Sequence, residues 1–235
     1  EGLNYYVCDD TSFWRVVNFI DSVTFNASDD LKVIEATGKA FGEFQTRLSD
    51  FDGSVLYETI PDFHNTKKRY ADFLAAVERN AAGRVDSVRD EIKFITDRAD
   101  KCSLIVDALA SGNLPLRVTH NDTKINNVLF QPEDNSALIV IDLDTVMPGS
   151  SLYDFGDSIR TGAASAAEDE PDLAKVHFLS EMFKAYARGF IKGTGGALTE
   201  RELQMLPDGG YIITLEQAIR FLGDYLDGDT YYHTD

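Results

Sequence analysis

The sequence has few cysteines and no long apolar runs, and each shortage excludes a class of protein. The two cysteines, Cys8 and Cys102, lack the paired spacing of a disulfide framework and favour a reducing compartment. No apolar run approaches the roughly 18 residues that a membrane span requires, and no signal peptide is visible. We therefore expect a cytoplasmic protein that does not act in a membrane.

Basic side chains are also scarce, with 22 Lys and Arg against 40 Asp and Glu, and the net charge is -18. This charge disfavours nucleic acid and anionic membranes as partners. The 235 residues, 43% of them hydrophobic, suffice for one large soluble domain, or for one domain and a fragment of another. Internal repeats and low-complexity tracts are absent.

The stretch 116–160 carries the candidate catalytic and metal-binding side chains. Two short β-branched runs, 117–119 and 137–141, each lead into a polar loop, and a loop at a strand end holds side chains on a rigid base. The first loop contains a histidine, a carboxylate, a lysine and an amide, at His120, Asp122, Lys124 and Asn127. The second loop begins with two carboxylates, Asp142 and Asp144.

These residue types are the ones that metal-assisted phosphoryl transfer requires. A carboxylate must orient and deprotonate the acceptor hydroxyl, oxygen ligands must hold Mg²⁺ on the phosphates of ATP, and a cation must meet the transferring group. We predict Asp122 as the base and Lys124 as the cation. Asn127 and Asp142 are the predicted metal ligands, and Asp144 either binds a second ion or orients the loop.

Each loop has a simpler interpretation when it is taken alone. An Asp-x-Asp after a strand is commonly a turn with a helix cap, and a single histidine such as His120 is commonly packed for structural reasons. The two loops in this order, each at a strand end, favour the catalytic interpretation.

The loop 120–127 resembles the catalytic loop of protein kinases. Thr-His-Asn-Asp-Thr-Lys-Ile-Asn-Asn-Val-Leu-Phe, Ile-Asp-Leu-Asp-Thr-Val-Met-Pro-Gly and Leu-Tyr-Asp-Phe-Gly-Asp are more closely similar to the N-acetylhexosamine 1-kinases of the aminoglycoside phosphotransferase superfamily. Trp14-Arg15, Phe63-His64-Asn65-Thr66 and the final Phe-Leu-x-Asp-Tyr-Leu extend this resemblance along most of the chain.

The resemblance implies transfer of the γ-phosphate of ATP to the anomeric hydroxyl of N-acetylglucosamine or N-acetylgalactosamine. It places Arg220 and Tyr231, with Asp224 nearby, on the sugar or its developing phosphate. It assigns structural support of the site to His120, Asp154 and Asp157. For His64 we expect a surface or helix-capping role in preference to a contact with substrate.

The fold implied is α+β and protein kinase-like, with residues 1–30 as a remnant of the small-lobe strands and the hinge, and residues 31–235 as a mainly helical large lobe. We predict a strand over 13–20 with a hairpin partner over 5–8. Helices are predicted over 31–48, from residue 65 or 66 to about 83, and over 86–110, 171–192, 199–206 and 211–226.

The sequence has no glycine-rich phosphate loop and no Val-Ala-x-Lys strand before residue 13, so we expect the rest of the small lobe to be a missing segment of the same protein. Two alternatives stay open. The chain is a catalytically silent binding lobe, or it is a kinase of another small molecule, such as homoserine, choline or an aminoglycoside.

Overall fold

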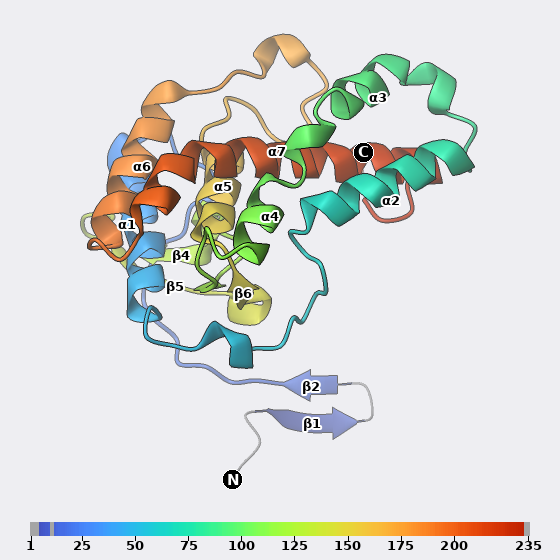
Figure 1. Ribbon diagram of the computed structural model, residues 1–235. Helices are drawn as coiled ribbons and strands as arrows, with labels where there is room; N and C mark the ends of the chain where they lie inside the picture. The colour runs from blue at the N-terminus through green and yellow to red at the C-terminus, as the bar shows by residue number, and fades with distance from the viewer. Residues whose placement is uncertain (1–4, 10–11, 233–235) are drawn as a thin grey trace.

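A computed structural model describes residues 5–9 and 12–232. Within these ranges the chain is mainly helical, with three short antiparallel strand pairs. The principal helices are α1 (Leu31–Arg47), α2 (Thr66–Arg79), α3 (Arg89–Thr96), α4 (Leu104–Ala110), α5 (Ser151–Gly162), α6 (Ser180–Gly193) and α7 (Glu200–Asp227). Figure 1 shows that α7 crosses the helical body and lies beside α2, α4 and α5. None of the described helices has both the length and the apolar composition of a membrane span.

Two helix pairs form the centre of the body. In the pair α1–α6 the backbones touch at small residues, because a Cβ at Gly189 would collide with the carbonyl oxygen of Glu35. In the pair α5–α7, Gly156 and Gly209 allow the same close approach. Phe41, Phe155 and Phe190 are fully buried between α1, α5 and α6 and form the main core with Val128 and Phe130.

The strand pairs bring the two polar loops together. β3 (Arg117–Thr119) pairs with β6 (Met147–Gly149), and β4 (Val128–Phe130) pairs with β5 (Ala137–Val140). The loop between β3 and β4 and the loop between β5 and β6 therefore emerge side by side. β1 (Tyr6–Asp9) and β2 (Ser12–Trp14) form a separate hairpin, which Figure 1 shows set apart from the helical body.

Several predicted elements are present with small shifts. The helix predicted over 31–48 is α1, and its N-cap is the side chain of Asp30, which accepts from the N–H of Lys32 at 2.8 Å. The helix capped by Asn65 is α2, although it ends at Arg79, where Asn80 adopts the left-handed conformation. The hairpin partner expected over 5–8 is β1.

The prediction of a strand over 13–20 was wrong for residues 15–20, because β2 ends at Trp14. Residues 15–20 pair with no described strand, and their apolar side chains, including those of Val16 and Phe19, are largely exposed. The apolar and polar residues do alternate over this segment, but no described strand pairs with residues 15–20 to stabilise them as a strand.

Four helix predictions were wrong in their boundaries. The single helix over 86–110 is divided into α3 and α4, because Ile95 packs on the end of α7 while Ile105 packs on α5 and an earlier part of α7. The helix over 171–192 starts only at Ser180, because residues 163–165 pair with 177–179 and hold that segment extended. The two final helices are one, α7, which continues through Pro207 because Gly209 and Gly210 pack tightly on α5.

Candidate active site

The loop 120–127 holds the Asp122 carboxylate between two donors. Lys124 Nζ lies 2.9 Å from Oδ1 of Asp122, and Asn127 Nδ2 lies 3.0 Å from Oδ2. The same Asn127 amide donates to the backbone carbonyl of Asp122 at 2.8 Å, which closes the loop into one turn. The Asp122 side chain keeps 29% of its surface exposed, so this carboxylate is oriented and also accessible.

The charge of Lys124 is secured by its neighbour. Burial lowers the pKa of this lysine, but the hydrogen bond and the negative charge of Asp122 outweigh burial and raise the pKa above its usual value. Lys124 is therefore a cation at physiological pH, placed where negative charge would gather during phosphoryl transfer.

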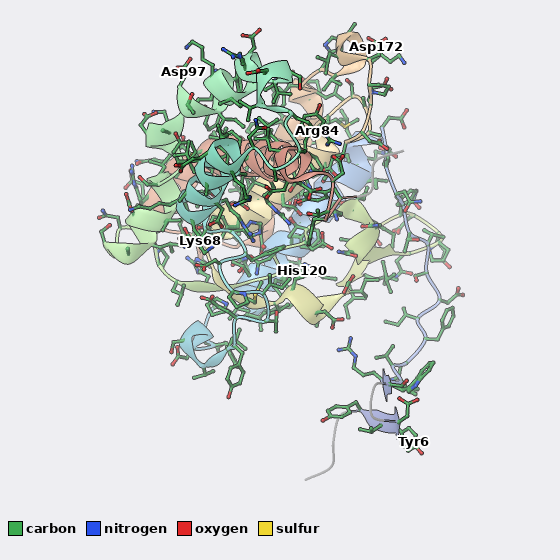
Figure 2. The ribbon with its side chains drawn as sticks, turned by 90° about the vertical axis from the view of Figure 1, so that its right-hand side faces the viewer. Tyr6, Lys68, Arg84, Asp97, His120 and Asp172 are labelled. Atoms are coloured by element: carbon green, nitrogen blue, oxygen red, sulfur yellow. The ribbon has the colours of Figure 1, made fainter. Side chains whose placement is uncertain are left out.

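His120 connects the two loops. Its Nε2 lies 2.9 Å from the carbonyl oxygen of Ile141, and the backbone N–H of Asp122 donates to Nδ1 at 3.3 Å. Because Nδ1 accepts, Nε2 carries the proton and donates to Ile141. The ring is fully buried and makes edge contacts with Phe41 and Phe44, and Figure 2 shows it in the interior. The structure thus gives His120 a supporting position beneath the site.

The second loop places Asp142 next to Asn127. The N–H of Ile141 donates to the carbonyl of Asn127 at 2.9 Å, so the residues that follow each strand are neighbours. Asp142 adopts the left-handed conformation, with φ of 61°, which aspartate and asparagine tolerate better than most residues. The Asp142 carboxylate is exposed and makes no hydrogen bond or ion pair with any described residue.

This donor set fits Mg²⁺. Mg²⁺ is commonly held by one or two protein ligands together with water and substrate phosphates, and the oxygens of Asn127 and Asp142 are ligands of that kind. The described residues contain no group of three or more His, Cys, Asp or Glu side chains suited to a metal. Asp144 stands apart from this pair, because its carboxylate forms an exposed ion pair with Arg15 at 2.6 Å.

Asp154, in the first turn of α5, and Asp157, in the middle of α5, bind the backbone of the loop 120–127. Asp154 is fully buried and accepts from the N–H groups of His120 at 3.0 Å and Asn121 at 2.8 Å, and from the Gln45 amide at 2.6 Å. Asp157 accepts from the N–H of Thr123 at 2.9 Å. Burial raises the pKa of Asp154, while these donors oppose that effect. Both carboxylates therefore accept hydrogen bonds from the backbone of the loop.

The three residues predicted to contact substrate line one cavity of about 400 Å³ between α2, α7 and the C-terminal segment. The guanidinium of Arg220 lies within 6 Å of three aromatic rings, those of Phe63, Tyr231 and Tyr232. The i, i+4 ion pair that the sequence allowed between Arg220 and Asp224 does not form. No carboxylate among the described residues pairs with Arg220, although the chain has a net charge of -18.

Asp224 instead shapes the cavity. Its carboxylate accepts from the backbone N–H groups of Thr230, Tyr231 and Tyr232 at 2.8 to 2.9 Å, and from the Thr230 hydroxyl at 3.0 Å. Burial raises the pKa of Asp224, but the N–H groups of Tyr232 and Tyr231 outweigh it, and the pKa is lowered. The C-terminal segment is thus folded back onto α7, with Tyr231 beside Arg220.

Sequence reasoning missed Gln217, which lies between this cavity and a larger one. Its amide oxygen accepts from Arg220 at 3.3 Å, and its amide nitrogen donates to the Tyr232 hydroxyl at 3.2 Å. Gln217 also lines a second cavity of about 740 Å³, whose wall includes Lys124 and Arg160. The side chain therefore connects the surroundings of Asp122 with those of Arg220. The only signal in the sequence was the i, i+3 spacing to Arg220.

Comparison with known proteins places the chain in a family. The chain matches the family model described as phosphotransferase enzyme family, APH, over residues 3–189, and it belongs to that family. Its α+β fold, mainly helical with a reduced sheet, is the protein kinase-like fold of that family. The chain is also similar to a solved structure, an aminoglycoside-3'-phosphotransferase of type VIII, at 18% identity and a TM-score of 0.40. That match covers 84% of this chain and 64% of the other, so the chain spans less than two thirds of the solved protein.

Proposed function

We propose that this protein transfers the γ-phosphate of ATP to a hydroxyl group of a small molecule. The observation that carries this proposal is the arrangement around Asp122. Its carboxylate is fixed by Lys124 and Asn127 and remains accessible, and the loop that carries Asp142 is joined to this loop by the hydrogen bond from the Ile141 N–H to the Asn127 carbonyl. A carboxylate base, a cation and oxygen ligands for a divalent ion are then within one pair of loops.

In this proposal each side chain has one task. Asp122 accepts a hydrogen bond from the acceptor hydroxyl and takes its proton as the oxygen attacks the γ-phosphorus in line with the leaving ADP. Lys124 compensates negative charge on the transferring phosphoryl group. Asn127 and Asp142 supply oxygen ligands for Mg²⁺, which when bound neutralises charge on the ATP phosphates.

The preferred acceptor is an N-acetylhexosamine, phosphorylated at its anomeric hydroxyl. The cavity around Arg220 supports this proposal, because it combines three aromatic rings with a cation that pairs with no carboxylate of the described residues, and such groups suit a sugar face and a developing phosphate. Asp224 contributes by holding Tyr231 in this wall. Homoserine, choline or an aminoglycoside remain candidate acceptors.

Residues 1–30 are proposed to belong to a small lobe and hinge that pack on further small-lobe structure of the same protein. The exposed apolar side chains of Trp14, Val16, Val17 and Phe19 support this proposal, because apolar groups gathered on one segment commonly mark a contact surface. Arg15 also reaches Asp144 in the second loop, which connects this segment to the site.

A screen of Mg·ATP against hexosamines, amino alcohols and aminoglycosides tests the proposed function. Formation of ADP with N-acetylglucosamine or N-acetylgalactosamine, and of the corresponding sugar 1-phosphate, is the expected result. Turnover with only one of the other classes would reassign the acceptor. Binding of sugar without any turnover would favour a catalytically silent binding lobe.

A further inference from the structure

His64 and Glu216 form a buried pair next to the Arg220 cavity, and neither residue lines that cavity. His64 Nδ1 lies 2.9 Å from Oε1 of Glu216, and the Thr66 hydroxyl donates to Oε2 at 2.5 Å. The side chains of His64 and Glu216 are 9% and 2% exposed. The second ring nitrogen, Nε2 of His64, is buried and has no partner among the described residues.

The pair joins two segments at the points that define the cavity wall. Glu216 lies one helical turn before Arg220 on the same face of α7. His64 directly follows Phe63, whose ring lies 5.8 Å from the Arg220 guanidinium. The contact of His64 with Glu216 therefore sets the distance between Phe63 and Arg220. The imidazole is itself held between two rings, with Phe63 at 4.5 Å and Tyr153 at 4.9 Å.

The hydrogen bond with His64 stabilises the Glu216 carboxylate in its buried position. A carboxylate at 2% exposure requires donors, and the described residues supply only His64 and Thr66. If His64 lost its donor, Glu216 would keep one partner, and the turn of α7 that carries Arg220 would move to regain hydration or another donor.

We infer that His64 and Glu216 are positioning residues for acceptor binding, which act by fixing the Phe63–Arg220 wall of the cavity. The effect on acceptor binding rests on the proposed function. The fixing of Arg220 by His64 and Glu216 does not depend on that function. A general structural role for His64 would lower stability without moving Arg220.

Three substitutions at one position separate these roles. His64→Asn places an amide nitrogen close to the position of Nδ1 and keeps the donor to Glu216. His64→Gln carries its amide past that position, and His64→Leu has no donor. Ile105→Val serves as the control, because it removes a buried methylene group from α4 and lines neither cavity.

The first measurement is the NMR chemical shift of the Arg220 side chain without ligand, which reports its three surrounding rings. We expect the parent shift in His64→Asn and Ile105→Val and a changed shift in His64→Gln and His64→Leu. If His64→Leu does not fold, His64→Gln decides. An unchanged Arg220 shift in the variants without the donor would overturn the inference, whether or not any sugar binds.

The second measurement is calorimetric titration with N-acetylglucosamine. The affinity should fall about tenfold or more in His64→Gln and stay near the parent value in His64→Asn, because loss of one hydrogen bond from the charged Arg220 to the sugar weakens binding by about this factor. A parent protein that does not bind N-acetylglucosamine, with the Arg220 shifts as expected, would contradict the proposed acceptor and leave the geometric inference supported. Equal sugar affinity in parent and His64→Gln would overturn the role in acceptor binding.

Discussion

Nε2 of His120 donates to the carbonyl of Ile141 at 2.9 Å, and this bond fixes the loop of Asp122 against the loop of Asp142. Asp122 and Asp142 are 20 residues apart in the sequence, yet the loops of the proposed base and the proposed metal ligand are both hydrogen-bonded to one imidazole. The relationship explains why a fully buried histidine stands beside two functional loops.

Substitution of His120 by leucine should therefore lower turnover more than stability alone explains. The apolar side chain keeps contact with Phe41 and Phe44 but cannot bond to Ile141 or Asp122, so Asp122 shifts and the rate should fall by about a hundredfold. Phe44→Leu is the matched control, since it removes a ring contact and leaves both hydrogen bonds in place. Turnover of His120→Leu at the level of Phe44→Leu, measured at equal folded fraction, would remove the imidazole from this role.

Removal of the Asp142 carboxylate should raise the Mg²⁺ concentration needed for half-maximal turnover by about tenfold or more, because one oxygen ligand is lost. Asn127→Ala should act in the same direction and also loosen Asp122, whose carboxylate and carbonyl it bonds. Asp144→Asn is the comparison, because Asp144 pairs with Arg15 at an exposed position and should have a smaller effect. Superimposable Mg²⁺ titrations of Asp142→Ala and parent would show that Asp142 is not a ligand.

Loss of the Asp224 carboxylate should release the C-terminal segment from α7. Four donors from Thr230, Tyr231 and Tyr232 would lose their acceptor, and a hydrogen bond to a charged group contributes about 1.5–3 kcal/mol. In Asp224→Ala, chymotrypsin should cut after Tyr231 and Tyr232 at a clearly higher rate, and sugar affinity should fall. Asp227→Ala, which removes an ion pair with Arg79, provides the control. Equal cleavage rates would show that the segment is held by other contacts.

Because of Glu202, the free energy of unfolding should depend on pH in the acidic range. Burial raises the pKa of Glu202, but hydrogen bonds from Arg117, Thr199 and Ser151 outweigh it and hold the pKa below its ordinary value of 4.5. Because the folded pKa is depressed, the stabilisation is present above pH 4.5 and is lost as pH falls through the folded pKa.

The variant Glu202→Gln leaves the buried Arg117 without its carboxylate and should cost about 3–5 kcal/mol at neutral pH. The difference from the parent in urea unfolding should shrink as the pH falls below 4.5. Glu200→Gln, an exposed neighbour in the first turn of α7, should change stability by less than about 0.5 kcal/mol. A constant difference across this pH range would contradict the assignment of the pKa shift to Glu202.

The sequence was sufficient to predict structural features that depend on interactions between residues close together in the chain. The helices predicted from residue 31, from residue 65 or 66 and from residue 199 begin within one residue of these positions, because Asp30, Asn65 and Thr199 cap them through bonds to residues two or three positions ahead. The loops of Asp122 and Asp142 were located because each follows a β-branched run. The helix boundaries at 86–110 and around Pro207 failed because tertiary contacts with α5 and α7 decide them.

The surroundings of the site were beyond sequence reasoning for the same reason. Gln217 connects Arg220 with Tyr232, 15 residues away, and His64 meets Glu216 over 152 residues. Neither contact has a spacing signature. The i, i+4 spacing of Arg220 and Asp224 gives no ion pair, because the backbone N–H groups of residues 230–232 bind the Asp224 carboxylate instead.

The most direct test of the central proposal is the kinetics of Asp122→Asn with Mg·ATP and N-acetylglucosamine. The amide keeps the shape of the side chain but cannot accept the proton, so turnover should fall below detection while calorimetry shows sugar binding close to that of the parent. Turnover of Asp122→Asn within about tenfold of the parent would contradict the role of Asp122 as the base, since general bases typically contribute 10²–10⁴-fold.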